Sequence, residues 1–142
     1  MSKIPLVDVK ANYLRHRDAI DAAMCEVIES TSFIQGPALA SFEEAFAAYC
    51  GARFAVGVGS GTAALHLVLA ALGVNPGDEV AIPSHTFVAT AEPVTWLGAT
   101  PRFVSLRPPD WGFDPDELKR AFSSRTRAVI VNTPHNPTGK VF

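Results

Sequence analysis

A glycine-rich turn, Gly59-Ser60-Gly61-Thr62, contains the residues of this chain that are best suited to bind an anion. It follows a β-branched segment, residues 53–58, and opens an apolar run over residues 62–72 that we expect to be helical. A turn from a strand into a helix leaves the first backbone N–H groups without partners, and the helix dipole adds positive potential there. The hydroxyl groups of Ser60 and Thr62 add two more donors. The turn therefore suits a phosphate, although the same glycines also suit a plain strand-to-helix turn.

The spacing of this turn fits neither of the two common nucleotide-binding loops. A P-loop has a lysine and then Ser or Thr directly after its last glycine, whereas Gly61 is followed by Thr62 and Ala63. The dinucleotide fingerprint needs a third glycine where this chain has Thr62. The acidic pair Asp78-Glu79 precedes the next expected strand, whereas a ribose-binding acid would follow it. These mismatches argue against a nucleotide-binding α/β domain.

The composition is that of one modest globular domain with 142 residues, 48% of them hydrophobic and 18% charged. A net charge of −2 and the lack of a basic stripe argue against a nucleic-acid partner. Residues 1–5 lack the apolar core of a signal peptide, and the longest nearly apolar run, residues 63–74, is too short to cross a bilayer. Cys25 and Cys50 fit no metal-binding spacing. We therefore expect a cytoplasmic protein without a metal or a membrane, whose cysteines are reduced and partly buried.

The order of expected elements divides the chain into a helical segment, residues 1–52, and an α/β segment, residues 53–142. In the first segment the apolar spacing predicts helices over residues 13–29 and 38–49. In the second it predicts strands over residues 53–58, 79–83, 101–106 and 127–132, and helices over residues 62–72, 89–97 and from a cap at Asp114 to Phe122. This alternation predicts an α/β fold with a parallel or mostly parallel sheet and helices on its faces.

Three loops follow the expected strands and should share one edge of the sheet. They are residues 59–62, 84–87 and 133–139. In an open α/β sheet, ligands bind beyond the carboxyl ends of the strands. The sequence therefore predicts one ligand site built from these three loops.

Two of the loops carry side chains that suit a heteroaromatic ligand. The ring of Phe87 can stack on such a ligand, although a core position is the other interpretation. The Asn136 side chain can bond a phenolic oxygen, although it also suits an Asx turn. His85 and His135 lie in the same two loops and are further candidates to line the site.

Residues 4–103 closely resemble the amino-terminal part of the DegT/StrS-type nucleotide-sugar aminotransferases, which are pyridoxal-phosphate enzymes. The matching segments are Ile4–Asp8, Phe33–Pro37, Phe42–Glu44, Val58–Leu65, Pro76–Val80 and Pro83–Thr90. The resemblance implies that residues 53–142 are the first part of the large domain of PLP-transferase fold type I, without its remaining sheet and the carboxyl-terminal domain. It also implies that Ser60, Gly61 and Thr62 hold the phosphate of pyridoxal 5′-phosphate and that Phe87 stacks on its pyridine ring.

From about Ser105 the chain resembles class I aminotransferases instead, through Leu106–Trp111 and Asn132–Phe142. There the asparagine that matches Asn136 hydrogen-bonds the phenolic oxygen of the cofactor. Residues 98–104 are the natural junction, and both a recombinant of two related genes and a divergent member of one family fit this pattern.

Transamination also needs a lysine that forms a Schiff base with the cofactor and an acid against the pyridine nitrogen. In both families these residues match positions beyond this chain, whose lysines are Lys3, Lys10, Lys119 and Lys140. We therefore assign no catalytic residue and expect Lys140 to be a solvated loop lysine. The expected function is that of the amino-terminal portion of an aminotransferase, inactive alone, which moves an amino group from a small-molecule donor to a keto-sugar nucleotide or a 2-oxo acid. A homodimer is expected for the full-length form, and a non-catalytic remnant or dimerising module is the alternative.

Overall fold

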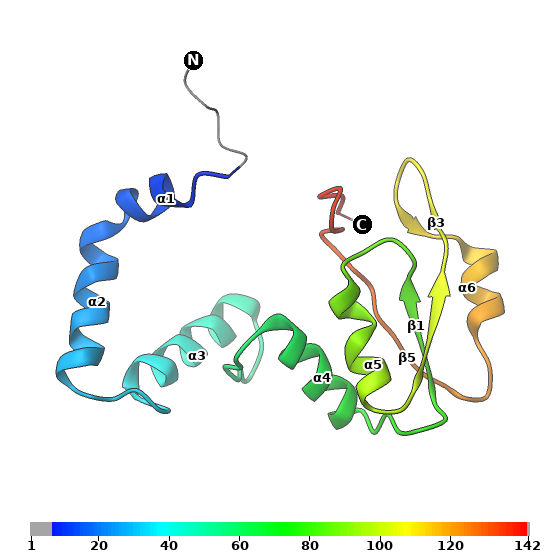
Figure 1. Ribbon diagram of the computed structural model, residues 1–142, viewed down its shortest axis with the longest axis horizontal. Coiled ribbons are helices and arrows are strands. Elements are labelled where there is room, and N and C mark those ends of the chain that lie inside the picture. Colours follow the sequence, from blue (N-terminus) through cyan, green and yellow to red (C-terminus); the bar gives the residue numbers. More distant parts are fainter. Residues whose placement is uncertain (1–6, 142) are drawn as a thin grey trace, which may run out of the picture. The chain divides into compact units, whose positions relative to one another are not determined.

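The computed structural model describes residues 7–141 and divides the chain into two compact units, one ending at Gly57 and the other beginning at Val58 (Figure 1). Residues 4–6 of the first matching segment lie outside the described residues.

Within residues 7–57 the first unit contains three helices, α1 (Val9–Arg15), α2 (Arg17–Glu29) and α3 (Pro37–Cys50). The prediction of one helix over residues 13–29 is wrong at its start, because the helix is interrupted at His16. There the backbone N–H of His16 bonds the carbonyl of Tyr13, three residues back, at 3.0 Å. The second prediction is confirmed: α3 ends at Cys50 and is followed by the C-cap residue Gly51, which has a left-handed φ of 64°.

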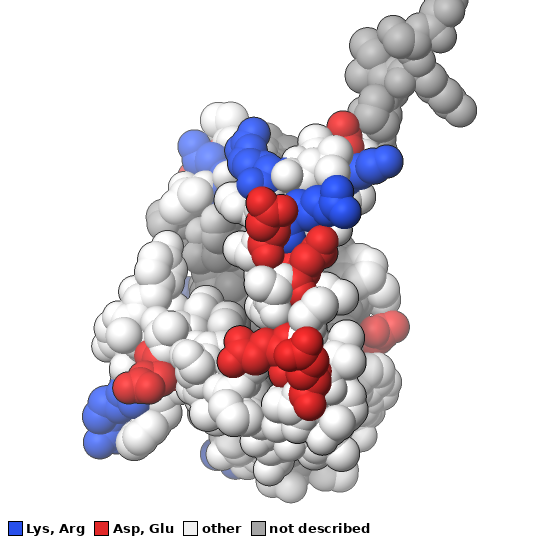
Figure 2. Space-filling model, turned by 90° about the vertical axis from the view of Figure 1, so that its left-hand side faces the viewer, with Lys and Arg blue, Asp and Glu red and all other residues white. Residues whose placement is uncertain are grey.

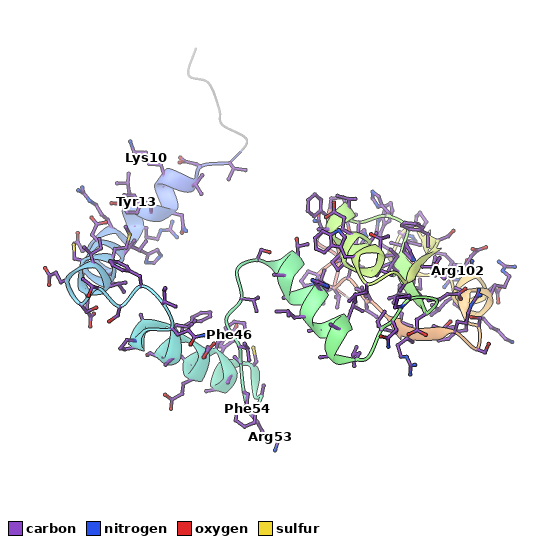
Figure 3. The ribbon with its side chains drawn as sticks, turned by 60° about the horizontal axis from the view of Figure 1, so that its bottom comes forward. Lys10, Tyr13, Phe46, Arg53, Phe54 and Arg102 are labelled. Carbon is purple, nitrogen blue, oxygen red and sulfur yellow. The ribbon has the colours of Figure 1, made fainter. Side chains whose placement is uncertain are left out.

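The prediction of a strand over residues 53–58 is wrong. Residues 52–57 run without helix or strand after α3, because no described residue of the first unit forms a strand that could pair with them. Glu43 holds the end of this segment, since its Oε1 accepts a hydrogen bond from the Gly57 N–H at 2.6 Å. Figure 3 shows Arg53 beside Phe54, with the guanidinium 5.6 Å from the ring centroid. The segment is therefore held by contacts to α3 rather than by a sheet: the Ala52 N–H bonds the Ala47 carbonyl at 2.9 Å, and Glu43 binds its other end.

The second unit confirms the α/β fold with a parallel sheet. Its main elements are α4 (Gly61–Ala71), β1 (Glu79–Pro83), η1 (Val88–Thr90), α5 (Glu92–Trp96), β2 (Thr100–Val104), α6 (Pro115–Ala121) and β5 (Thr126–Val129). The strand order is β2-β1-β5, and both pairs are parallel. In Figure 1, α5 and α6 lie on opposite sides of this sheet.

The central strand β1 is buried along its whole length and packs on both sides. Val80 and Ile82 form one cluster with residues of α4 and α5, among them Leu69 and Val94. Ala81 forms the other cluster, with residues of β2 and α6. The two clusters alternate along β1 because successive side chains of a strand point to opposite faces. They fix β1 between two layers of helix.

Several element ends differ from the predictions. The expected helix over residues 89–97 is split into η1 and α5, and the expected strand over residues 101–106 ends as β2 at Val104. A short antiparallel pair, β3 (Leu106–Arg107) and β4 (Gly112–Phe113), follows it and was not predicted. β5 stops at Val129, short of the predicted end. Its partner β1 ends at Pro83, which has no N–H to continue the ladder.

A buried carboxylate ties the start of β1 to the segment before β5. Glu79 has a side chain only 4% exposed and accepts hydrogen bonds from the Ser123 hydroxyl at 2.7 Å and the Arg125 guanidinium at 2.5 Å. Both bonds lower the pKa of Glu79 below its ordinary value, and the bond from Ser123 has the larger effect. A group with a lowered folded-state pKa stabilises the fold above its unfolded-state pKa, about 4.3 for Glu, and loses that contribution as the pH falls through the folded-state value.

We expect the Glu79→Gln variant to lose less stability than the wild type when the pH is lowered from about 7 to about 3, because it lacks the carboxylate that must be protonated. Urea unfolding at the two pH values measures the difference. Glu44→Gln replaces an exposed glutamate of α3 and is the matched control. Equal pH dependence in Glu79→Gln and the wild type would contradict the assignment.

The two cysteines, expected to be partly buried in helices, lie on the surface. Cys25 and Cys50 are both exposed, so the prediction of partial burial is wrong. Among the described residues of the first unit, Ala47 is the only buried hydrophobic residue. The helices of this unit therefore have almost no core in which a cysteine could be buried. The face in Figure 2 carries small groups of acidic and basic side chains separated by uncharged surface. Within residues 7–141, no helix is long and apolar enough to cross a membrane, and no three metal-ligating side chains gather.

Candidate cofactor site

The amino end of α4 has free donor capacity and open space in front of it. Ser60 is the N-cap, with its Oγ accepting from the Ala63 N–H at 3.1 Å. The N–H groups of Gly61 and Thr62 belong to the first turn, where a helix supplies no acceptor of its own. A Cβ built on Gly59 or Gly61 would meet no atom within 4 Å. An anion can therefore approach this turn, and the helix dipole favours it there.

The direction of α4 places this turn at the edge of the sheet where ligands are expected. α4 ends at Ala71, and a short connection leads to the start of β1 at Glu79, so the two elements run in opposite directions. α4 also packs against α5 and η1, the elements that follow β1. Its amino end is therefore on the side of the carboxyl ends of the strands, as Figure 1 shows.

Phe87 lies in the loop between β1 and η1, and its side chain is 62% exposed. It is therefore not a core residue of the described chain, contrary to the alternative interpretation. It is the N-cap residue of η1, with extended backbone angles, and η1 contacts α4. An exposed aromatic ring thus lies at the start of η1, an element that contacts α4.

The loop that carries Asn136 is joined to the loop that carries Phe87. Asn132 Nδ2 donates to the Thr86 hydroxyl at 2.6 Å and lies 3.4 Å from the backbone oxygen of Asn136. Asn136 itself is exposed, so its side-chain amide is accessible to a ligand. The structure thus brings two of the three predicted loops together by hydrogen bonds, and the third approaches through the packing of α4 on η1.

The two histidines of these loops differ in their exposure to solvent. His85 is exposed, whereas His135 is buried, with 1% of it exposed. Both rings contact the indole of Trp111, at centroid distances of 5.1 Å and 5.7 Å. Sequence reasoning did not assign Trp111, Thr86 or Asn132 to the site. Asn132 and Thr86 could have been found as the polar residues next to Asn136 and Phe87, but the position of Trp111 depends on the β3–β4 turn.

A pocket of about 310 Å³ adjoins this cluster. Its apolar lining comes mainly from the ends of β1 and β5 and from the β3–β4 pair, namely Pro83, Val131, Leu106, Trp111 and Phe113. Phe113 also packs against the cluster that α6 covers. The pocket therefore lies on the α6 side of the sheet, whereas α4 and η1 belong to the α5 side.

Comparison with known proteins decides the family. The chain matches the DegT/DnrJ/EryC1/StrS aminotransferase family over residues 15–134. The chain belongs to this family. The match continues beyond the proposed junction at residues 98–104, so most of the segment that resembles class I enzymes also lies within it. The class I resemblance of residues 105–142 stays a prediction.

Individual members of the family are close in sequence and structure. A dTDP-3-amino-3,4,6-trideoxy-alpha-D-glucose transaminase from Streptomyces venezuelae is 44% identical over 90% of this chain and 34% of its own length. The solved structure of S. venezuelae DesV in complex with a ketimine intermediate superposes with a TM-score of 0.88 at 40% identity, over 98% of this chain and 38% of that chain. NtdA from Bacillus subtilis, solved with the bound cofactor PMP, has a TM-score of 0.82 at 33% identity, over 91% and 30% of the two chains. The chain thus spans about a third of the length of this curated relative.

Proposed function

We propose that the chain forms the amino-terminal part of a pyridoxal-phosphate-dependent aminotransferase that acts on a keto-sugar nucleotide. The observation that carries the proposal is the open amino end of α4, with Ser60 as its cap and Gly61 and Thr62 in its first turn. Membership of an aminotransferase family supports the reaction. The names of the S. venezuelae transaminase and of NtdA with PMP, the amine form of pyridoxal phosphate, support the sugar substrate and the cofactor.

The residues of the three loops fit the two ends of pyridoxal phosphate. The hydroxyls of Ser60 and Thr62 and the first N–H groups of α4 would bind the phosphate, which carries the charge that a helix amino end favours. The exposed ring of Phe87 would cover one face of the pyridine ring and keep water from it. The Asn136 amide would donate to the phenolic oxygen and so orient the ring. When bound, the cofactor supplies the electron sink that makes amino transfer possible.

The acceptor and the assembly are part of the same proposal. A keto-sugar nucleotide is the acceptor that the family supports, whereas a 2-oxo acid is the acceptor that the class I resemblance around Asn136 suggests. For the full-length form we propose a homodimer. In the first unit, α2 exposes apolar side chains such as Met24 (57%) and Ile28 (59%), and α3 exposes Phe42 (57%) and Phe46 (48%), which a second copy would cover.

Equilibrium binding of pyridoxal phosphate and of pyridoxal to the 142-residue chain tests the cofactor assignment. We expect pyridoxal phosphate to bind at least about tenfold more tightly, because pyridoxal lacks the charged group that α4 would hold. Equal binding of the two compounds would contradict it. Borohydride reduction followed by mass spectrometry separates the alternatives. We expect no stoichiometric adduct at a single lysine, whereas such an adduct at Lys140 would make this chain a self-contained pyridoxal-phosphate protein.

A further inference from the structure

The loops that carry Phe87 and Asn136 are held together by a buried histidine. His135 Nε2 lies 2.8 Å from the backbone oxygen of His85, two residues before Phe87. On the other side of the ring, His135 Nδ1 lies 2.8 Å from the hydroxyl of Thr138. His135 therefore connects its own loop to the loop after β1 through one ring and two hydrogen bonds.

These partners determine which ring nitrogen carries the proton. The His85 backbone oxygen can only accept, so Nε2 of His135 must donate to it. In the Nε2–H tautomer, Nδ1 is an acceptor, and the Thr138 hydroxyl must donate to it. The same hydroxyl oxygen accepts a hydrogen bond from the backbone N–H of Lys140, at an N···O distance of 3.3 Å. The His85 carbonyl thus selects the tautomer, and the Thr138 hydroxyl supplies the donor that the other ring nitrogen then needs.

Trp111 covers this connection. Its indole stacks on the His135 ring with an interplanar angle of 13° and a centroid distance of 5.7 Å. Trp111 has a φ of 60°, a left-handed conformation that is uncommon for a bulky residue and that persists only where its surroundings favour it. Because His135 is only 1% exposed, the hydrogen bond to His85 is shielded from water and is hard to exchange.

We propose that His135 is a positioning residue. Its Nε2–H tautomer, selected by the His85 carbonyl, hydrogen-bonded on the other side by the Thr138 hydroxyl and covered by Trp111, fixes the loop of Asn136 against the loop of Phe87 and so sets the spacing of the two groups that would hold the cofactor ring. The effect on the cofactor rests on the proposed function. The tautomer and the connection between the loops do not.

The first test needs no ligand. Nitrogen-15 correlation spectra of the histidine rings in the 142-residue chain should show His135 in the Nε2–H tautomer, with slow exchange of that proton. The Thr138→Val variant keeps the shape of the side chain but loses the hydroxyl that donates to Nδ1. The Nε2–H tautomer should remain, because the His85 carbonyl requires it, but its proton should exchange faster than in the wild type. A His135 ring in the Nδ1–H tautomer, or a mixture of tautomers in the wild type, would overturn the proposal.

The second test uses ligands that separate the ring from the phosphate. We expect His135→Leu to weaken binding of pyridoxal phosphate about tenfold and to leave the affinity for inorganic phosphate unchanged, since phosphate would bind at α4. His135→Gln keeps an N–H donor and should restore most of the affinity, and His16→Gln, at an exposed histidine of the first unit, is the control.

The outcomes distinguish the two proposals. If neither phosphate nor pyridoxal phosphate binds at α4 in the wild type, the proposed function fails, while the tautomer spectrum still decides the role of His135. If pyridoxal phosphate binds equally to the wild type and to His135→Leu, the positioning role is overturned. Should His135→Leu fail to fold, Thr138→Val takes its place and should weaken the binding of pyridoxal phosphate in the same way.

Discussion

The Ser60→Asp variant should bind pyridoxal phosphate about 100-fold more weakly than the wild type while its helix α4 stays equally stable. Aspartate is as good an N-cap as serine, so its carboxylate can accept the Ala63 N–H that Ser60 Oγ accepts at 3.1 Å. The same carboxylate would face the phosphate. Two unit charges about 4 Å apart near a protein surface repel by roughly 4 kcal/mol, and 100-fold corresponds to about 2.7 kcal/mol. Isothermal titration calorimetry and thermal unfolding measure the two quantities.

Two further variants separate capping from ligand binding. Ser60→Ala removes the cap and should cost about 1 kcal/mol of stability, with a smaller loss of affinity than Ser60→Asp. Thr62→Val removes a hydroxyl that does not cap α4. It should weaken the binding of pyridoxal phosphate without changing the stability of the chain. If Ser60→Asp bound pyridoxal phosphate as well as the wild type does, the phosphate would not lie at the amino end of α4.

Replacement of Ile82 by alanine should lower the free energy of unfolding by about 3 kcal/mol. Ile82 is 0% exposed in the central strand and packs in the cluster that joins β1 to α4 and α5. Its removal loses buried apolar surface and leaves a cavity between layers that cannot collapse freely. Urea unfolding followed by circular dichroism gives the difference.

Phe103 provides the matched control on the neighbouring strand. It is the register partner of Ile82 in β2 but is 61% exposed. Phe103→Ala should therefore cost less than about 1 kcal/mol. Equal losses in the two variants would mean that the cluster around β1 is not the main core of the second unit.

Local signals predicted the parts of the fold whose determinants are close in sequence. The bounds of β1 agree with the prediction because a short apolar strand is flanked by Asp78 and by a polar loop. The start of α6 agrees because Asp114 accepts hydrogen bonds from the N–H groups of Asp116 and Glu117, at 2.9 Å and 3.0 Å. Such capping involves only four residues and can be predicted without knowledge of the fold.

Structure that depends on distant partners could not be predicted in the same way. Residues 53–58 have the composition of a strand, but a strand forms only where a neighbour accepts its hydrogen bonds. The pair β3–β4 contains only two residues on each side, too few to give an alternating pattern. The burial of His135 depends on Trp111 and on the carbonyl of His85, which lies 50 residues earlier.

The candidate site was predicted by loop order rather than by contacts. The alternation of strands and helices placed the loops of Ser60, Phe87 and Asn136 at one edge of the sheet. The hydrogen bond from Asn132 to Thr86, which joins two of them, comes from side chains that the pattern did not single out. The roles of the site residues toward the cofactor stay predictions.

The most direct test of the cofactor site is a titration of the nitrogen-15-labelled chain with pyridoxal phosphate, followed through its backbone amide spectrum. We expect the largest shifts at the amides of Gly61 and Thr62, with further shifts at Phe87 and Asn136. Inorganic phosphate should shift the first pair only. Shifts confined to other parts of the chain, or none at Gly61 and Thr62, would contradict the account that the amino end of α4 holds the cofactor phosphate.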